Sequence, residues 1–130
     1  MKYSLKNEEK LKSKILIGEL FEKGKSLSKF PLRLVYLKSE HSSNYPIKVA
    51  FSAPKRRFKK AVDRNRIKRL MREAYRKNKH ILYSNIEEKH IIMFTYLDEN
   101  ELKYVEIEEK LILLLKRLSD KIKSCQHEES

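Results

Sequence analysis

Hydrophobic residues in this chain recur in two patterns, one typical of helices and one typical of strands. Three-and-four spacing predicts helices over residues 7–23, 61–77 and 105–123. Short alternating or apolar runs predict strands over residues 32–37, 47–53 and 91–96. The last run, IIMFTY, is nearly all apolar, as expected of a strand that is buried on both faces.

The order of these segments predicts the fold class. Helix–strand–strand–helix–strand–helix, with room for an extra strand between the first helix and Pro54, indicates one mixed sheet of about four strands with helices packed on it. We therefore expect an α/β (α+β) two-layer sandwich. Residues 1–123 are expected to form a single domain, and the polar segment 124–130 is expected to be a disordered tail.

The ends of the first helix carry local signals. Ser13 is a possible N-cap for a shorter helix that begins near Lys14. Gly24 stands where a left-handed residue would end the helix, and Pro31 prevents any later continuation.

The positive charge of the chain is concentrated in one segment. Lys and Arg total 31 against 18 Asp and Glu, which gives a net charge of +13 and a pI near 9.8. Residues 51–80 hold 13 of the basic residues but only two acidic ones, Asp63 and Glu73, whereas the rest of the chain is near neutral. Such a local excess repels itself unless a polyanion neutralises it, so nucleic acid is the first partner to consider.

Within this segment, residues 55–60 form a basic connector between the predicted strand 47–53 and the predicted helix 61–77. The helix has an apolar stripe and an opposite face rich in arginine, the side chain that binds phosphate oxygens with a planar fork of donors. Only Glu73 and Lys77 place a Glu four residues before a Lys or Arg, which disfavours a merely solvated charged helix. The candidates for nucleic-acid binding, which the resemblance described below assigns to RNA, are Lys55, Arg56, Arg57, Lys59, Lys60, Arg64, Asn65, Arg66, Lys68, Arg69, Arg72 and Arg76.

Other function classes find little support. There is no HExxH motif and no Gly-rich phosphate loop, the four histidines lack ligand spacing, and Cys125 has no base beside it in sequence. We therefore expect no catalytic residue and no metal site on the protein itself. Apolar runs of four or five residues fall short of the roughly 20 that span a bilayer, and the charged N-terminus lacks a secretory signal. A cytoplasmic protein without a membrane partner is expected.

Residues 61–75, AVDRNRIKRLMREAY, resemble the RNR signature of the bacterial ribonuclease P protein component. The context is also similar: a strand ending in VAFS and followed by Lys55 and Arg56 precedes the motif, and the sequence LFEKG ends the first helix. The resemblance covers roughly residues 11–122 and is weakest over residues 39–45 and after Asn78. It implies that the motif helix joins two parallel strands by a left-handed crossover, an exception to the usual right-handed rule.

The resemblance implies a function as well. The protein would pair with a large catalytic RNA, and together they would remove the 5′ leader from precursor tRNA by hydrolysis. The RNA would perform the chemistry and hold the Mg²⁺ ions, with no cofactor bound by the protein. The motif helix would lie against the RNA. The alternatives are a non-catalytic RNA-binding protein, such as a ribosomal component or RNA chaperone, and, with less support, an autonomous nuclease.

The resemblance also implies a cleft between the first helix and the sheet that holds the single-stranded leader. Its expected lining residues are Ile17, Phe21 and Tyr36. Ile17 stands where many family members have an aromatic residue, and the strand aromatic of the family falls on Tyr36 or, without a gap, on Val35. Ordinary core packing is the alternative for Phe21 and Tyr36.

Overall fold

The computed structural model describes residues 5, 9–39, 45–56, 58–83 and 88–129. The elements are α1 (Lys14–Lys23), β1 (Lys25–Lys29), β2 (Leu32–Lys38), β3 (Ile47–Ser52), α2 (Ala61–Asn78), α3 (His80–Tyr83), β4 (His90–Tyr96) and α4 (Tyr104–Glu129). The predicted order is confirmed, and the extra strand is β1. The four-residue helix α3 is too short for a periodic signal in the sequence.

The four strands form one mixed sheet in the order β1-β2-β4-β3. Strand β4 pairs antiparallel with β2 and parallel with β3. Helix α2 is therefore the crossover between two neighbouring parallel strands, as expected for the motif helix. Its left-handed sense stays a prediction.

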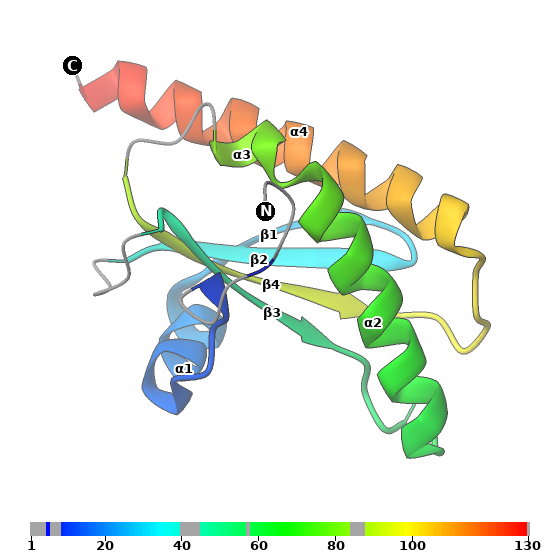
Figure 1. Cartoon of the computed structure of the whole chain (residues 1–130). Helices are drawn as coiled ribbons and strands as arrows, with labels where there is room; N and C mark the ends of the chain where they lie inside the picture. Colours follow the sequence, from blue (N-terminus) through cyan, green and yellow to red (C-terminus); the bar gives the residue numbers. More distant parts are fainter. Residues whose placement is uncertain (1–4, 6–8, 40–44, 57, 84–87, 130) are drawn as a thin grey trace.

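Helices cover both faces of this sheet (Figure 1). Helices α2 and α4 pack on one face, where residues such as Leu34, Ile92 and Phe94 join Ile67 and Leu111 in the larger core cluster. This sheet and its two long helices are the expected two-layer sandwich. The short helix α1 covers only one end of the opposite face (Figure 1).

The alternation of side chains along β2 decides which residues face which helices. Leu32, Leu34 and Tyr36 belong to the cluster under α2 and α4. Val35 is buried in the smaller cluster beneath α1, and Leu37 packs against that cluster. Successive strand residues point to opposite faces, so this assignment is fixed along the whole strand.

The segment before α1 is held against the edge of β3 and the end of α2. Lys10 forms a parallel bridge with Val49, and the amide of Leu11 donates to the carbonyl of Val49 at 2.8 Å. The buried carboxylate of Glu9 accepts from Lys79 Nζ at 2.7 and 3.0 Å and from the hydroxyl of Tyr83. Removing either partner would leave an uncompensated charge in the interior, so both groups favour this docked position of the segment.

Both ends of α1 follow from local chemistry, although one differs from the expectation. Ser13 Oγ accepts from the amide of Leu16 at 3.3 Å, so the shorter version of the helix is the correct one. Gly24 does end the helix, but its φ of −71° and ψ of 155° are extended, and the predicted left-handed conformation is wrong. Glycine fits here because a Cβ would lie 2.3 Å from the carbonyl oxygen of Leu20 and 2.8 Å from Cγ1 of Val35.

The C-terminal helix is longer than the periodic pattern predicts. The sequence places its end at Lys123, but α4 continues to Glu129 and includes most of the segment expected to be a disordered tail. No Gly or Pro follows Lys123 to stop the helix. None of the helices in the described part of the chain is long and apolar enough to cross a membrane.

Replacing Gly24 with Ala tests whether close packing requires this glycine. We expect Gly24→Ala to destabilise the fold by about 1–3 kcal/mol, the usual cost of forcing an extra carbon into a packed site. Gly18→Ala is the matched control, since a Cβ at Gly18 meets nothing within 4 Å. In a helix interior that change should stabilise the fold by roughly 0.5–1 kcal/mol. Urea unfolding measures both, and equal effects would contradict the packing argument.

Candidate nucleic-acid interface

Helix α2 presents one face to the core and another to solvent. Ile67, Met71, Ala74 and Tyr75 are buried, as its apolar stripe predicts. Asn65, Arg66, Arg69 and Arg72 are exposed, whereas Arg64, Lys68 and Arg76 are half-buried. The structure therefore brings most of the predicted cations of this helix to one side of the molecule.

Four side chains on this side make no hydrogen bond or ion pair with any described residue. We refer to these three cations and one neutral amide as the free cationic face: Lys68, Arg69, Arg72 and Asn65. The guanidinium groups of Arg69 and Arg72 keep all their hydrogen-bond donors for an external acceptor. These residues are the best candidates for direct contact with a polyanion.

Arg64 differs from these residues because its side chain forms hydrogen bonds that stabilise the basic connector. Its Nη1 donates to the carbonyls of Phe58 at 2.8 Å and Lys59 at 3.0 Å. Phe58 is buried, with its ring centroid 5.6 Å from that of Tyr96. Anchored in this way, the connector presents its remaining described cations to solvent: Lys55, Arg56, Lys59 and Lys60. The candidate Arg57 lies outside the described residues.

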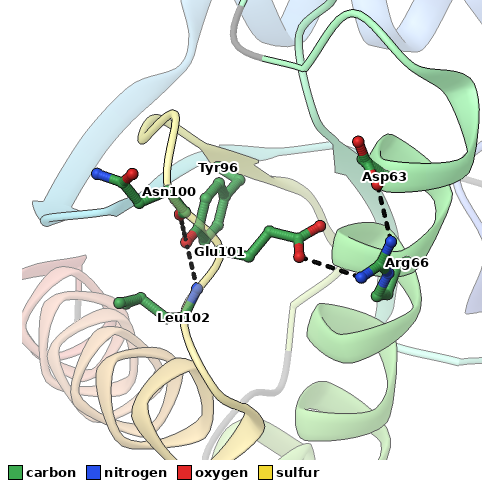
Figure 2. A network of polar contacts seen from close by, with 6 residues as sticks. All are labelled: Asp63, Arg66, Tyr96, Asn100, Glu101 and Leu102. Carbon is green, nitrogen blue, oxygen red and sulfur yellow. Dashed lines mark hydrogen bonds and ion pairs between the residues drawn. The ribbon is translucent and has the colours of Figure 1, made fainter.

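Arg66 is held by two carboxylates (Figure 2). It donates from Nη2 to Asp63 Oδ1 at 2.7 Å and from Nη1 to Glu101 Oε2 at 3.1 Å. The loop that carries Glu101 is tied to Tyr96, whose hydroxyl donates to the Asn100 carbonyl at 2.6 Å and accepts from the Leu102 amide at 3.1 Å. Sequence spacing could find Asp63 but not Glu101. Arg66 therefore has two acidic partners within the protein, and its contact with RNA stays a prediction.

Arg76 is also paired with a carboxylate. Its Nε and Nη2 donate to the two carboxylate oxygens of Glu73 at 3.1 and 2.8 Å, and this hydrogen bonding lowers the pKa of Glu73. The sequence spacing instead suggests Glu73 with Lys77, but the ammonium of Lys77 lies over the ring of Tyr104, 5.3 Å from its centroid. Desolvation raises the pKa of Tyr104 to about 12.

The three predicted leader-binding residues do not lie together. Phe21 is 62% exposed at the C-terminal end of α1, so core packing does not explain it. Ile17 is half-buried and packs against the small cluster under α1. Tyr36 packs on the other side of the sheet, with the core under α2 and α4. The strand residue beneath α1 is Val35, the other residue that the sequence analysis considered. The placement of Tyr36 on the α1 side of the sheet is therefore wrong.

The space directly between α1 and the sheet is occupied by apolar side chains. Leu11, Leu20, Val35, Ile91 and Met93 are buried there in one cluster. A bound strand of RNA would therefore have to pass beside α1 and over the part of the sheet that α1 leaves uncovered.

The described part of the chain contains no cluster of metal-ligating side chains. Among the described residues, no three or more His, Cys, Asp or Glu side chains lie close enough together to hold a metal ion. The arrangement offers cations, an amide and an exposed aromatic ring, which are the groups that proteins use to bind RNA backbone and unpaired bases.

Comparison with known proteins identifies the family. The family model for ribonuclease P matches residues 5–119. The chain belongs to the ribonuclease P protein family. A ribonuclease P protein component from Porphyromonas gingivalis is 44% identical over 90 residues, which are 68% of this chain and 65% of that relative. The alignment thus spans less than two thirds of that relative's length. The ribonuclease P protein component from Clostridium novyi is 33% identical over 114 residues, which are 87% of this chain and 96% of that relative.

Solved structures of the ribonuclease P family have the same fold. The Staphylococcus aureus RNase P protein superposes with a TM-score of 0.69 at 21% identity, covering 85% of this chain and 94% of its own. The Thermotoga maritima protein gives a TM-score of 0.65 at 26% identity, covering 84% and 96%. A mutant of the S. aureus protein is described as having defective mRNA degradation activity. It gives a TM-score of 0.67 at 20% identity and covers 85% of this chain and 87% of its own.

The contrast between Arg64 and Arg69 can be tested by stability alone. Arg64→Ala should destabilise the protein by about 1–2 kcal/mol, because it removes two charge-assisted hydrogen bonds to carbonyls of the connector. Arg69→Ala should change stability by no more than about 0.5 kcal/mol, as is usual for an exposed side chain without partners. Urea unfolding of both variants without RNA gives the comparison. A large loss in Arg69→Ala would show that it is a structural residue.

Proposed function

We propose that this chain is the protein subunit of ribonuclease P. It binds the catalytic RNA and the 5′ leader of precursor tRNA, assists endonucleolytic removal of the leader, and broadens the range of substrates. The observation that carries this proposal is the free cationic face, on the motif helix of a chain that belongs to the ribonuclease P family. The resemblance of its motif supports the placement of that helix against the RNA.

The cations of α2 and of the basic connector would act on two polyanions at once. Catalytic RNA and precursor tRNA repel each other, and Lys or Arg placed between them replaces condensed counterions and lowers that repulsion. Arg69 and Arg72 would supply forked contacts to phosphate oxygens. Lys55 and Arg56 would extend the same positive surface beyond the helix.

The chemical step would belong to the RNA. In the proposed holoenzyme, Mg²⁺ is bound by the RNA subunit and supplies the metal-assisted hydrolysis, and this chain contributes no catalytic side chain. Its own residues bind and orient the two RNAs. We expect this assembly in the cytoplasm, where precursor tRNA is processed in bacteria.

Leader binding would involve the exposed end of α1. The ring of Phe21 is open to solvent and able to stack on an unpaired base, a contact that tolerates any base sequence. Ile17 would support this region from below through the apolar cluster. Tyr36 is not part of this proposal, since it belongs to the opposite core.

Cleavage assays separate this function from its alternatives. Protein freed of RNA should leave precursor tRNA intact in magnesium, whereas protein with its catalytic RNA should yield a mature 5′-phosphate end. A ribosomal component or RNA chaperone would not stimulate cleavage by the catalytic RNA. Metal-dependent cleavage of precursor tRNA by rigorously RNA-free protein would instead support an autonomous nuclease.

The role of the free cationic face is testable through salt dependence. Arg69→Ala and Arg72→Ala should each weaken assembly with the catalytic RNA. Each lost phosphate contact should reduce the slope of log K against log salt by about 0.7–0.9, the value expected from counterion release. Binding titrations at several salt concentrations measure the slope. Arg76→Ala is the matched control, because its guanidinium is already paired with Glu73 and should change the slope less.

A further inference from the structure

Strand β1 is an edge of the sheet, opposite to the edge that leads into the basic connector. The strand order β1-β2-β4-β3 places it there, and in the described part of the chain it pairs with β2 alone. An edge strand presents a row of amide and carbonyl groups that can pair with another chain. Which groups these are, and what surrounds them, determines the partner that this edge fits.

The hydrogen bonds of β2 determine which backbone groups of β1 point outward. The amide of Leu97 donates to the carbonyl of Pro31 at 2.7 Å, so alternate residues of β2, counted from Pro31, bond to β4. The residues between them bond to β1, opposite its first, third and fifth residues. Ser26 and Ser28 therefore turn their amides and carbonyls away from the sheet.

Two lysines flank an apolar residue on one side of this edge. Leu27 packs against the core cluster under α2 and α4. Lys25 and Lys29 lie on the same side of the strand, because side chains alternate between the two faces. Both lysines are exposed, and neither forms a hydrogen bond or ion pair with a described residue.

Helix α4 adds cations beside the edge. Lys110, Arg117 and Lys121 follow one another at intervals of seven and four residues, which puts them on one side of the helix. Arg117 shows that this side faces β1, because its Nη1 donates to the carbonyl of Ser28 at 3.0 Å. Glu106 shares this side at the start of the helix, so the positive stretch begins at Lys110. We call the following residues the basic edge: Lys25, Lys29, Lys110, Arg117 and Lys121.

The charges of the basic edge disfavour a second copy of this chain as its partner. If two β1 strands paired antiparallel about Leu27, Lys25 of each copy would lie opposite Lys29 of the other. Like charges directly opposite one another destabilise a strand pair, whereas opposite charges stabilise it. An acidic strand would form two ion pairs at these positions and satisfy the outward backbone groups. RNA would neutralise the cations too, but a phosphate cannot donate a hydrogen bond to the outward carbonyl of Ser26.

We propose that the basic edge binds an extended acidic segment of a partner protein, which joins the sheet as a strand beside β1. Main-chain hydrogen bonds to Ser26 and Ser28 supply affinity, and carboxylates opposite Lys25 and Lys29 supply selectivity. Arg117 can share the carbonyl of Ser28 with the new strand, since a carbonyl oxygen has two lone pairs. This surface goes beyond the proposed function and lies apart from the free cationic face, so a holoenzyme can bind such a partner and its RNA together. The alternative is an edge whose cations only prevent pairing.

A blocked peptide, Thr-Glu-Thr-Val-Thr-Glu-Thr, is the probe for strand addition. Its Glu residues match the spacing of Lys25 and Lys29, and its Val faces Leu27. Titration into the isotope-labelled full chain should shift the amide resonances of Ser26 and Ser28. Peptide N-methylation at the Thr opposite Ser26 removes one main-chain donor and should weaken binding about tenfold. Fluorescence anisotropy should give the same affinity for the holoenzyme.

Charge-reversal variants test the selectivity of the edge. The double variant Lys25→Glu, Lys29→Glu should bind the Glu peptide about tenfold more weakly and should prefer the peptide in which both Glu are replaced by Lys. The single variant Lys25→Glu instead places a carboxylate opposite Lys29 of a second copy, twice in the same symmetric pair. Sedimentation equilibrium should show that its self-association is about tenfold tighter than that of the parent. Lys14→Glu is the matched control, because it makes the same change of charge on α1 and should associate as the parent does.

Three outcomes would overturn the proposal. Peptide binding that is insensitive to N-methylation would show general charge attraction without strand pairing. Shifts at Ser26 and Ser28 with single-stranded RNA, and none with the Glu peptide, would assign the basic edge to RNA. No shift with either ligand would leave an edge that is only protected. None of these outcomes bears on the proposed function, which cleavage of precursor tRNA measures separately.

Discussion

Strand β4 is buried on both faces, and the placement of nearly every other element follows from that constraint. It pairs with β2 on one side and with β3 on the other, so it lies inside the sheet. Its apolar side chains then require cover from both directions, which α2 and α4 supply above and α1 supplies below. Because α1 is short, cover on its side ends before the strand does, and Thr95 marks the point where it ends.

The same constraint determines where positive charge can be placed. As the crossover between β3 and β4, α2 has to bury Ile67, Met71 and Tyr75 against the sheet. Its cations can then occupy only the outer face. There Arg66 is paired with Asp63 and Glu101, and Arg76 is paired with Glu73. Lys68, Arg69 and Arg72 make no hydrogen bond or ion pair with any described residue, a state whose self-repulsion a bound polyanion would relieve.

Sequence periodicity predicted the elements well because helix and strand spacing are local properties. Features that depend on distant residues were missed. Gly24 is required by Val35 and the Leu20 carbonyl, not by its own backbone angles, and Arg66 is paired with a carboxylate 35 positions away. The choice between Tyr36 and Val35 is a shift of one residue, and in a strand such a shift changes the face on which a side chain lies.

Arg33 shows why the surroundings of a side chain on a sheet could not be found from composition. In the sequence it is a lone cation within an apolar strand, and its neighbours in space come from three other strands whose register no local pattern specifies. Only the paired sheet reveals that it stands between hydroxyls, on the face that α1 leaves open. The sheet thereby separates two surfaces in the proposed holoenzyme. The free cationic face of α2 would meet the catalytic RNA, the uncovered strands would meet the substrate leader, and the basic connector would join them at the end of β3.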